Sequence, residues 1–187
     1  TTMSNTFTVK SPANIAFIKY WGQTDSQLTL PCNDSFSMNL SECYTTLEIE
    51  VFDDPSVQQM EIKEYQPDGN GSYRSASPAE LKKVTDFYPV AKEYLHADSD
   101  FGFTIRSANS FPLKAGIASS ASFFSALAVA FAKAFGVKTT QQQLSVLARL
   151  TGSGSACRSI PDGFVWWSAG TDSSSSFATS LAGPSEW

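Results

Sequence analysis

The fold of this chain is decided by the stretch Pro112-Leu113-Lys114-Ala115-Gly116-Ile117-Ala118-Ser119-Ser120-Ala121-Ser122, where a loop of small residues runs into a long apolar segment. The segment from Ser120 to Phe135 is apolar on nearly every side and is followed by Gly136, which predicts a buried helix with a glycine C-cap. The free N–H groups at the start of such a helix, with small residues and serine hydroxyls beside them, suit an anion. The stretch predicts a phosphate-binding loop, although a small-residue loop alone is also typical of a plain tight connection.

A second run of small residues follows further along the chain and reads Gly152-Ser153-Gly154-Ser155-Ala156-Cys157-Arg158-Ser159. Its arginine is a planar donor suited to bidentate recognition of phosphate or carboxylate. A flexible linker seldom carries a cysteine and an arginine at its centre. Two anion-binding loops in one chain indicate a nucleotide and an acidic co-substrate.

The segments around the two loops predict mixed α and β structure in the α+β class. Apolar alternation and turn residues bound each element. Helices are expected from Pro78 to Leu95, and from an N-cap at Thr139 or Thr140 to about Leu150. Strands are expected at residues 7–9, 15–20, 45–51, 60–65, 101–107, 164–167 and 177–181.

Composition excludes several classes of function. With 42% hydrophobic residues among 187, the chain can bury a packed core. A net charge of −5 leaves no extended basic surface, so we expect no nucleic-acid partner. Residues 1–8 lack an export signal and no apolar run reaches membrane-spanning length, so we expect a cytoplasmic protein without a membrane partner.

Cysteine and histidine usage argues against other kinds of site. Cys32, Cys43 and Cys157 are odd in number and share no CxxC spacing, so neither a disulfide framework nor a zinc site is expected, and we predict no metal ligands. His96 is the only histidine, and a Ser-His-Asp hydrolase would have to use it. It lies at the expected end of a helix, so we interpret it as a surface residue.

The segment Ala13-Asn14-Ile15-Ala16-Phe17-Ile18-Lys19-Tyr20-Trp21-Gly22 places a lysine and two aromatic residues before a glycine turn. It is compatible with a plain sheet edge. Lys19 follows apolar neighbours, however, so its stem is expected to be buried while its ammonium group reaches a site.

These segments together resemble the mevalonate diphosphate (diphosphomevalonate) decarboxylase family of the GHMP kinase superfamily. The resemblance rests on residues 13–22, 109–122 and 152–159 and extends to the tail 172–187. The string Gly-Ser-Gly-Ser-Ala-Cys-Arg-Ser is more specific than the glycine loop that kinase relatives share. The resemblance to this family implies a ribosomal protein S5 domain 2-like fold, with residues 1–187 forming the N-terminal GHMP-type domain. The family's catalytic aspartate belongs to a C-terminal domain that we expect to be absent from this chain, so the isolated chain is expected to be inactive.

The resemblance also implies a reaction. ATP would phosphorylate the tertiary hydroxyl of mevalonate 5-diphosphate, and loss of that phosphate and of CO2 would give isopentenyl diphosphate and ADP in the mevalonate pathway of isoprenoid biosynthesis. ATP and Mg²⁺ are the implied cofactors, since magnesium bridges nucleotide phosphates in phosphoryl transfer generally. A homodimer is the implied assembly.

The site residues are carried over from the resemblance. Arg158 would orient the substrate carboxylate, Ser155 would hold the substrate, and Lys19 would lie beside it as the third catalytic residue. The wider substrate site would comprise Tyr20, Trp21, Gly22, Gln23, Ser153, Gly154, Ala156, Cys157 and Ser176. The nucleotide phosphates would contact Ala115, Gly116, Ala118, Ser119, Ser120 and Ser122.

Departures from the family pattern keep two alternatives open. Gln23 stands where the family has lysine, and an arginine expected after Pro78 is replaced by Lys82 or Lys83, which lose its bidentate geometry. Leu150-Thr151 contains one extra residue before the second loop. A GHMP small-molecule kinase, such as a mevalonate 3-kinase or a phosphomevalonate decarboxylase variant, is the alternative enzyme. A non-catalytic anion-binding fragment is the alternative outside enzymes.

Overall fold

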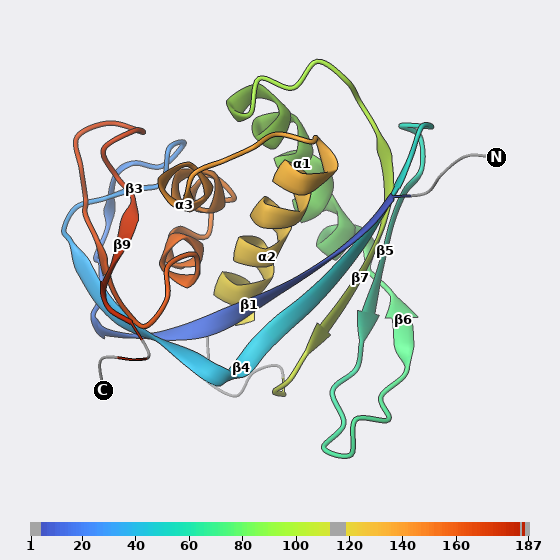
Figure 1. Cartoon of the computed structure of the whole chain (residues 1–187), viewed down its shortest axis with the longest axis horizontal. Helices are drawn as coiled ribbons and strands as arrows, with labels where there is room; N and C mark the ends of the chain where they lie inside the picture. The colour runs from blue at the N-terminus through green and yellow to red at the C-terminus, as the bar shows by residue number, and fades with distance from the viewer. Residues whose placement is uncertain (1–4, 113–118, 184, 186–187) are drawn as a thin grey trace.

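A computed structural model describes residues 5–112, 119–183 and 185. It confirms the α+β class. A mixed seven-stranded sheet has the order β6-β5-β7-β4-β8-β9, and β1 pairs with β4. The helices α1, α2 and α3 lie on one side of this sheet, as Figure 1 shows. A separate two-stranded sheet joins β2 (Gln23–Asp25) to β3 (Leu30–Pro31).

Two long antiparallel strands, β1 (Asn5–Ile18) and β4 (Ser35–Phe52), pair with each other along most of their length. The sequence predicted two short strands in place of β1. A single strand forms because register shifts at Pro12/Asn14 and Ala16/Ile18 absorb the irregular segment between them. At the first shift Pro12 pairs with Tyr44 and Asn14 with Asn39, so residues 40–43 of β4 face only one residue of β1.

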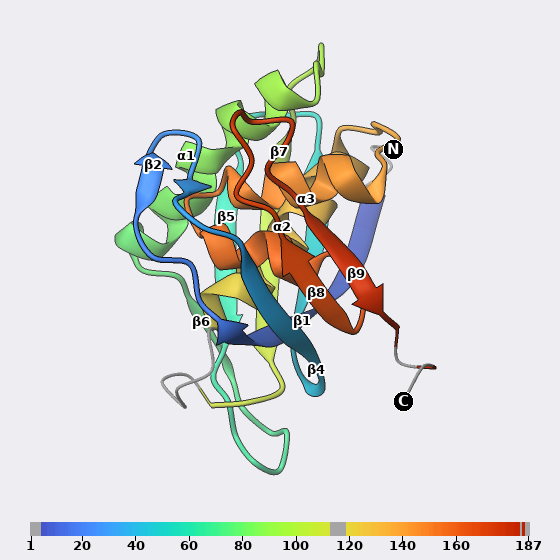
Figure 2. The same ribbon diagram turned by 90° about the vertical axis from the view of Figure 1, so that its left-hand side faces the viewer.

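The other strands add to the two halves of β4. Residues 45–52 pair with β7, and residues 35–38 pair with β8. Figure 2 shows β8 and β9 side by side at the edge of the sheet. β5 is parallel to β7, so the chain crosses over through α1 between them. The bounds are β5 Gln58–Lys63, β6 Tyr73–Ser75, β7 Gly102–Asn109, β8 Phe164–Trp167 and β9 Ala178–Ala182.

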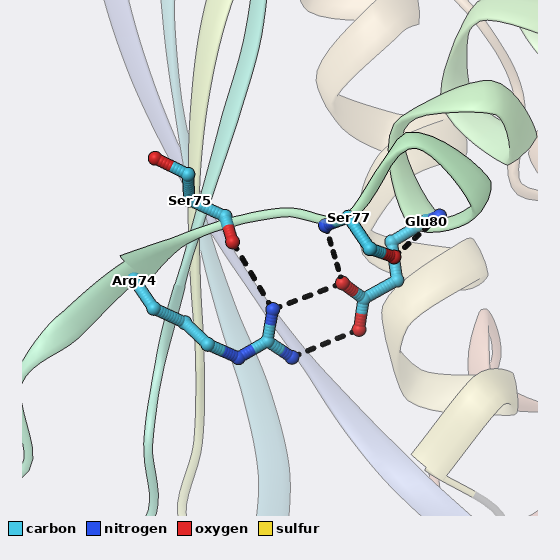
Figure 3. Close-up of polar contacts among 4 residues, drawn as sticks. All are labelled: Arg74, Ser75, Ser77 and Glu80. Carbon is cyan, nitrogen blue, oxygen red and sulfur yellow. Dashed lines mark hydrogen bonds and ion pairs between the residues drawn. The ribbon is translucent and has the colours of Figure 1, made fainter.

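Side-chain caps fix where α1 (Pro78–Tyr94) begins. Ser77 and Glu80 form a capping box, and Arg74 from β6 makes a two-pronged ion pair with Glu80 at 2.9 Å (Figure 3). These contacts hold the pKa of Glu80 down at about 2, mainly through the Arg74 hydrogen bonds. The start of α1 is therefore tied to the β5–β6 hairpin.

The remaining helices follow the sequence pattern closely. α2 spans Ser119–Ala134, and Gly136 beyond its end has φ +70°, as its predicted C-cap role requires. α3 spans Gln141–Arg149, and its N-cap is Thr140, which forms a capping box with Gln143. A 3-10 helix, η1 (Gly154–Ser159), occupies most of the second predicted loop.

Aromatic side chains fill the core between the helices and the sheet. Phe131 of α2 stacks on Phe87 of α1 with ring centroids 5.8 Å apart and contacts Phe103 of β7 at 5.7 Å. Tyr88 is buried beside them, and its hydroxyl accepts a 2.9 Å hydrogen bond from the backbone N–H of Phe101. This packing fixes α2, and with it the position of Ser119 and Ser120, against the sheet.

Within the described residues, no helix has the length and apolar character needed to cross a membrane. His96 lies just after α1, is exposed and has φ +51°, which agrees with the expected surface position.

Candidate functional site

A cleft of about 690 Å³ brings together residues from both predicted loops. Ser120 at the start of α2 lies on one side, and the segment Gly152–Ser155, here called the serine wall, lies on another. The other polar residues of the lining are Tyr20 from the segment after β1, Lys83 and Asp86 from α1, and Thr151. Four elements far apart in the sequence therefore converge on one concave surface, which is the arrangement typical of ligand sites.

A smaller cavity of about 200 Å³ adjoins the cleft, here called the side cavity. Lys83, Ser120 and Phe124 line both spaces, so they mark the boundary between them. The side cavity has an apolar lining from β5 and α2, namely Met60, Ile62, Phe123 and Phe124, with the polar residues Glu80, Ser107, Asn109 and Ser119.

Close packing behind the serine wall requires glycine at position 154. A Cβ at this position would lie 2.8 Å from the Trp167 ring, 2.9 Å from the Tyr20 hydroxyl and 3.2 Å from Thr29. Tyr20 in turn meets Trp167 edge to face, with ring centroids 4.8 Å apart. The backbone of the serine wall is thus pressed against a layer formed by Tyr20, Trp167 and Thr29.

Arg158 lies behind the serine wall and not on the surface of the cleft. Only 5% of it is exposed, and its Nη1 donates to Ser35 Oγ at 2.8 Å. Its guanidinium carbon lies 5.8 Å from the centre of the Trp167 ring. Burial lowers its pKa from the ordinary value, yet no carboxylate of the described residues forms an ion pair with it.

Asn14 is a site residue that the sequence analysis did not single out. Its Oδ1 accepts a hydrogen bond from Arg158 Nε at 3.3 Å, and its Nδ2 donates to Ser159 Oγ at 2.9 Å and to the Ser155 carbonyl at 3.0 Å. Only 3% of Asn14 is exposed. The available signal was an asparagine among apolar residues in the middle of a strand, where an unpaired amide is costly.

The other residues of η1 are structural. Ala156 and Cys157 are fully buried, and burial raises the pKa of the Cys157 thiol to about 12. The Cys157 carbonyl accepts from Ser145 Oγ of α3 at 3.2 Å, and the same hydroxyl accepts from the Ala178 N–H at 2.8 Å. Ser145 therefore joins η1 to β9.

The segment after β1 does not bury Lys19 as the sequence predicted. β1 ends at Ile18, and Lys19 lies exposed in the following turn because its neighbours no longer alternate between the two faces of a sheet. Trp21 is 75% exposed, and its backbone N–H donates to Asn33 Oδ1 at 2.9 Å. Gly22 has φ +70°, and Gln23 begins β2 with an exposed side chain. Of this group, only Tyr20 lines the cleft.

The predicted phosphate-contacting residues fall into three groups. Ala115, Gly116 and Ala118 lie outside the described residues. Ser119 and Ser120 begin α2 and line the cavities. Ser122 is fully buried and shares a 2.7 Å hydrogen bond with Thr45 Oγ1, so its hydroxyl faces the sheet.

Ser176 is buried below the layer that supports the serine wall. Its hydroxyl accepts from Trp167 Nε1 at 3.0 Å and donates to the Ser168 carbonyl at 3.0 Å. It is not among the residues that line the cleft. Among the described residues, no group of three or more His, Cys, Asp or Glu side chains could hold a metal ion.

The family model for the diphosphomevalonate decarboxylase-like N-terminal domain matches residues 11–178. This chain belongs to that family.

Relatives in the diphosphomevalonate decarboxylase family match nearly all of the chain. A diphosphomevalonate decarboxylase of Ganoderma lucidum is 37% identical over 191 residues, which cover 96% of this chain and 46% of that protein. A mevalonate diphosphate decarboxylase structure from Enterococcus faecalis has a TM-score of 0.82 and 34% identity, covering 96% of this chain and 52% of that one.

A further solved structure is described as MDDEF in complex with MVAPP, AMPPCP and magnesium. It has a TM-score of 0.81 and 33% identity, covering 96% of this chain and 51% of that one. The chain thus spans about half the length of the relatives it matches.

The structure distinguishes the two lysines that the diphosphomevalonate decarboxylase resemblance left open. Lys82 pairs with Asp86 at 2.6 Å one helical turn away, and both side chains are largely exposed. Lys83 instead lines the cleft and the side cavity. Lys83 is therefore the lysine that α1 presents to both spaces.

Thr151, just before the serine wall, closes the end of α3. Thr151 Oγ1 donates to the Ala148 carbonyl at 2.6 Å and accepts from the Ser153 N–H at 3.3 Å. Gly152 follows in the same turn with φ +84°.

Proposed function

We propose that the protein containing this chain catalyses the ATP-dependent decarboxylation of mevalonate 5-diphosphate to isopentenyl diphosphate, ADP, phosphate and CO2. The observation that carries the proposal is the single cleft lined by Ser120, Lys83 and the serine wall. Family membership and the ligands named for solved relatives support the same reaction. Two anionic reactants can meet only where their two sets of donors face a shared space.

In this proposal the nucleotide occupies the side cavity and the start of α2. The apolar side chains Met60, Ile62 and Phe123 provide a surface on which the planar base of the nucleotide packs, and the Asn109 amide can form hydrogen bonds with that base. Ser119 and Ser120, at the positive end of the α2 dipole, then face the phosphates. Ser122 supports this turn from below through its bond to Thr45.

The acidic substrate occupies the cleft, with its diphosphate near Lys83, Ser153 and Ser155 and with Tyr20 beside it. Lys83 and Ser120 lie at the boundary between the side cavity and the cleft. The phosphoryl group that moves from the nucleotide to the substrate therefore passes hydrogen-bond donors that are already in place before the reaction begins. Arg158 does not line the cleft, and its buried positive charge acts on the substrate carboxylate from behind the serine wall.

Asn14 fixes the guanidinium plane of Arg158 and the carbonyl of Ser155 together. A preset geometry suits this chemistry, because the carbon β to the carboxylate becomes electron-poor as phosphate leaves. Magnesium would neutralise the nucleotide phosphates when bound. A homodimer in the cytoplasm is part of the same proposal.

The test is a coupled measurement of ADP and CO2 release from mevalonate 5-diphosphate and MgATP, using the protein that contains this chain. We expect both products in equal amounts. ADP with phosphorylated substrate and no CO2 would identify a small-molecule kinase and contradict the proposal. Binding of both ligands by calorimetry without any product would instead identify an anion-binding protein.

A matched pair of serine variants tests whether Ser120 belongs to the active site. Ser120→Ala removes a hydroxyl at a position that lines both spaces, whereas Ser56→Ala changes an exposed serine in the turn between β4 and β5. We expect kcat/KM to fall by about 10-fold to 100-fold in the first variant and to stay unchanged in the second. Equal kcat/KM in the two variants would remove Ser120 from the site.

A further inference from the structure

Arg149, the last residue of α3, is fully buried and has no role in the site as described so far. Its guanidinium group donates to oxygen atoms on two other segments. Nη1 donates to the Leu28 carbonyl. Nε donates to the Ser176 carbonyl at 3.1 Å, and Nη2 donates to the Ser173 carbonyl at 2.7 Å and to Ser173 Oγ at 3.1 Å.

The hydrogen-bond acceptors of Arg149 are neutral oxygen atoms, and the carboxylates of Asp25 and Asp172 act on its charge only from a distance. Among the described residues no carboxylate forms an ion pair with it, and burial lowers its pKa from the ordinary value. An unpaired buried cation is costly unless its donors are occupied. Here the C-terminal end of α3 and four acceptor contacts meet that requirement. The arrangement depends on the planar five-donor fork of arginine.

The two segments held by Arg149 are those that back the serine wall. Leu28 precedes Thr29, which lies against Gly154. Ser176 holds the indole N–H of Trp167, and the Trp167 ring contacts both Gly154 and Tyr20. Arg149 therefore acts on the cleft through other residues and does not line it itself.

We propose that Arg149 is a positioning residue for the acidic substrate: it clamps the loop 25–30 and the turn 171–176 together, so that Thr29 and Trp167 hold the serine wall in its binding geometry. The inference rests on the proposed function, because it assigns the serine wall to the substrate. It predicts an effect on the substrate and none on the nucleotide, whose proposed donors at the start of α2 lie outside the clamp.

The test compares Arg149→Lys with Ile105→Val in the protein that contains this chain. Lysine keeps the charge but cannot donate to two segments in one plane. Ile105 is fully buried in β7 and serves as a control for general loss of stability. In Arg149→Lys we expect the KM for mevalonate 5-diphosphate to rise about tenfold, while the Kd for a non-hydrolysable ATP analogue stays within about twofold.

Hydrogen exchange supplies a readout that does not depend on turnover. In Arg149→Lys we expect faster amide exchange in residues 25–30 and 171–176, with α2 unchanged, whereas Ile105→Val should leave both segments protected. A rise in KM that Ile105→Val reproduces at an equal melting temperature would overturn the proposal, as would unchanged exchange in both segments. If wild-type protein turns over no substrate, the proposed function fails, and the exchange result still decides whether the clamp exists.

Discussion

The Asn14 side chain lies between Arg158 and the backbone of the serine wall, bonding to Arg158 Nε at 3.3 Å and to the Ser155 carbonyl at 3.0 Å. One amide on β1 thus sets the relative position of a buried cation and of a residue that lines the cleft. Ser155 and Arg158 both belong to the 3-10 helix η1. Their relative position is nevertheless held by Asn14, a residue far away in the sequence.

Replacing Asn14 should therefore damage both folding and turnover. Asn14→Ala leaves Arg158 Nε and Ser159 Oγ without this partner in a buried position, so we expect a stability loss of about 1–3 kcal/mol. Urea unfolding measures that loss, and kcat should fall as Arg158 reorients. Asn70→Ala, in the exposed turn between β5 and β6, is the control. Unchanged stability and turnover in Asn14→Ala would show that the amide does not position Arg158.

Gly154→Ala should disturb the cleft from behind. The added Cβ would lie within 3 Å of both Trp167 and the Tyr20 hydroxyl, and overpacking of this kind costs about 1–3 kcal/mol. We expect Tyr20 to be displaced and substrate affinity to fall, as calorimetry would measure. Gly69→Ala, in an open turn away from the cleft, should leave affinity unchanged. Equal affinity in both variants would argue that Tyr20 does not contact the substrate.

The two neighbouring lysines of α1 should differ in their effects. Lys83→Gln removes a cation that lines both spaces, so we expect weaker binding of the anionic substrate and a reduced dependence of KM on salt. Lys82→Gln loses an exposed pair with Asp86, which contributes about 0.5 kcal/mol or less to stability. Because the freed Asp86 carboxylate also lines the cleft, we expect a rise in KM, but a smaller one than in Lys83→Gln. The measurement is KM as a function of ionic strength, and a larger change in the Lys82 variant would reverse the assignment.

Acid should weaken the start of α1. The pKa of Glu80 is about 2 in the folded protein against 4.5 for the ordinary group, so folding favours its ionised form. Its contribution is complete above pH 4.5 and disappears as the pH falls toward 2. The ion pair is partly exposed, which limits the effect. We expect wild type to be more stable than Glu80→Gln in urea at pH 7 and equally stable near pH 2. A constant difference across this range would contradict the assignment.

Cysteine reactivity provides a check on the packing of η1. The pKa of Cys157 is raised to about 12 by complete burial, so its thiol should react with a disulfide reagent only after unfolding. Cys32 is exposed and should react in the native protein. Counting modified thiols by mass spectrometry with and without denaturant tests this. Rapid native labelling of Cys157 would show that η1 opens.

Local patterns in the sequence were sufficient for the helices. The apolar run before Gly136 and the threonine before Gln141 encode α2 and α3 through nearby residues alone, and both were predicted. The continuity of β1 was missed because pairing with β4 overrides the irregular segment around Pro12. Pairing of this kind is a tertiary property.

The candidate site shows the same division. Ser120, Tyr20 and the serine wall could be proposed from residue type and from the family resemblance. The importance of Arg149 could not be proposed, because its partners lie more than twenty residues away and are mostly backbone oxygens without a sequence signature. For Asn14 the sequence offered an amide among apolar residues, but that signal does not identify its distant partners. Lys19 was misjudged for a related reason: its burial depended on where β1 ends.

Residues 40–43 of β4, which face a single residue of β1, form an irregular segment within the longest strand of the sheet, where a change in length need not alter the pairing on either side. On either side of residues 40–43 the pairing register is set separately, by β8 and by β7. Gain or loss of a residue within 40–43 could be absorbed there without turning the side chains of either half to the wrong face. Length variation among relatives should therefore be tolerated at this place, while the same change at Ser35 or Leu47 would reverse a whole inner face.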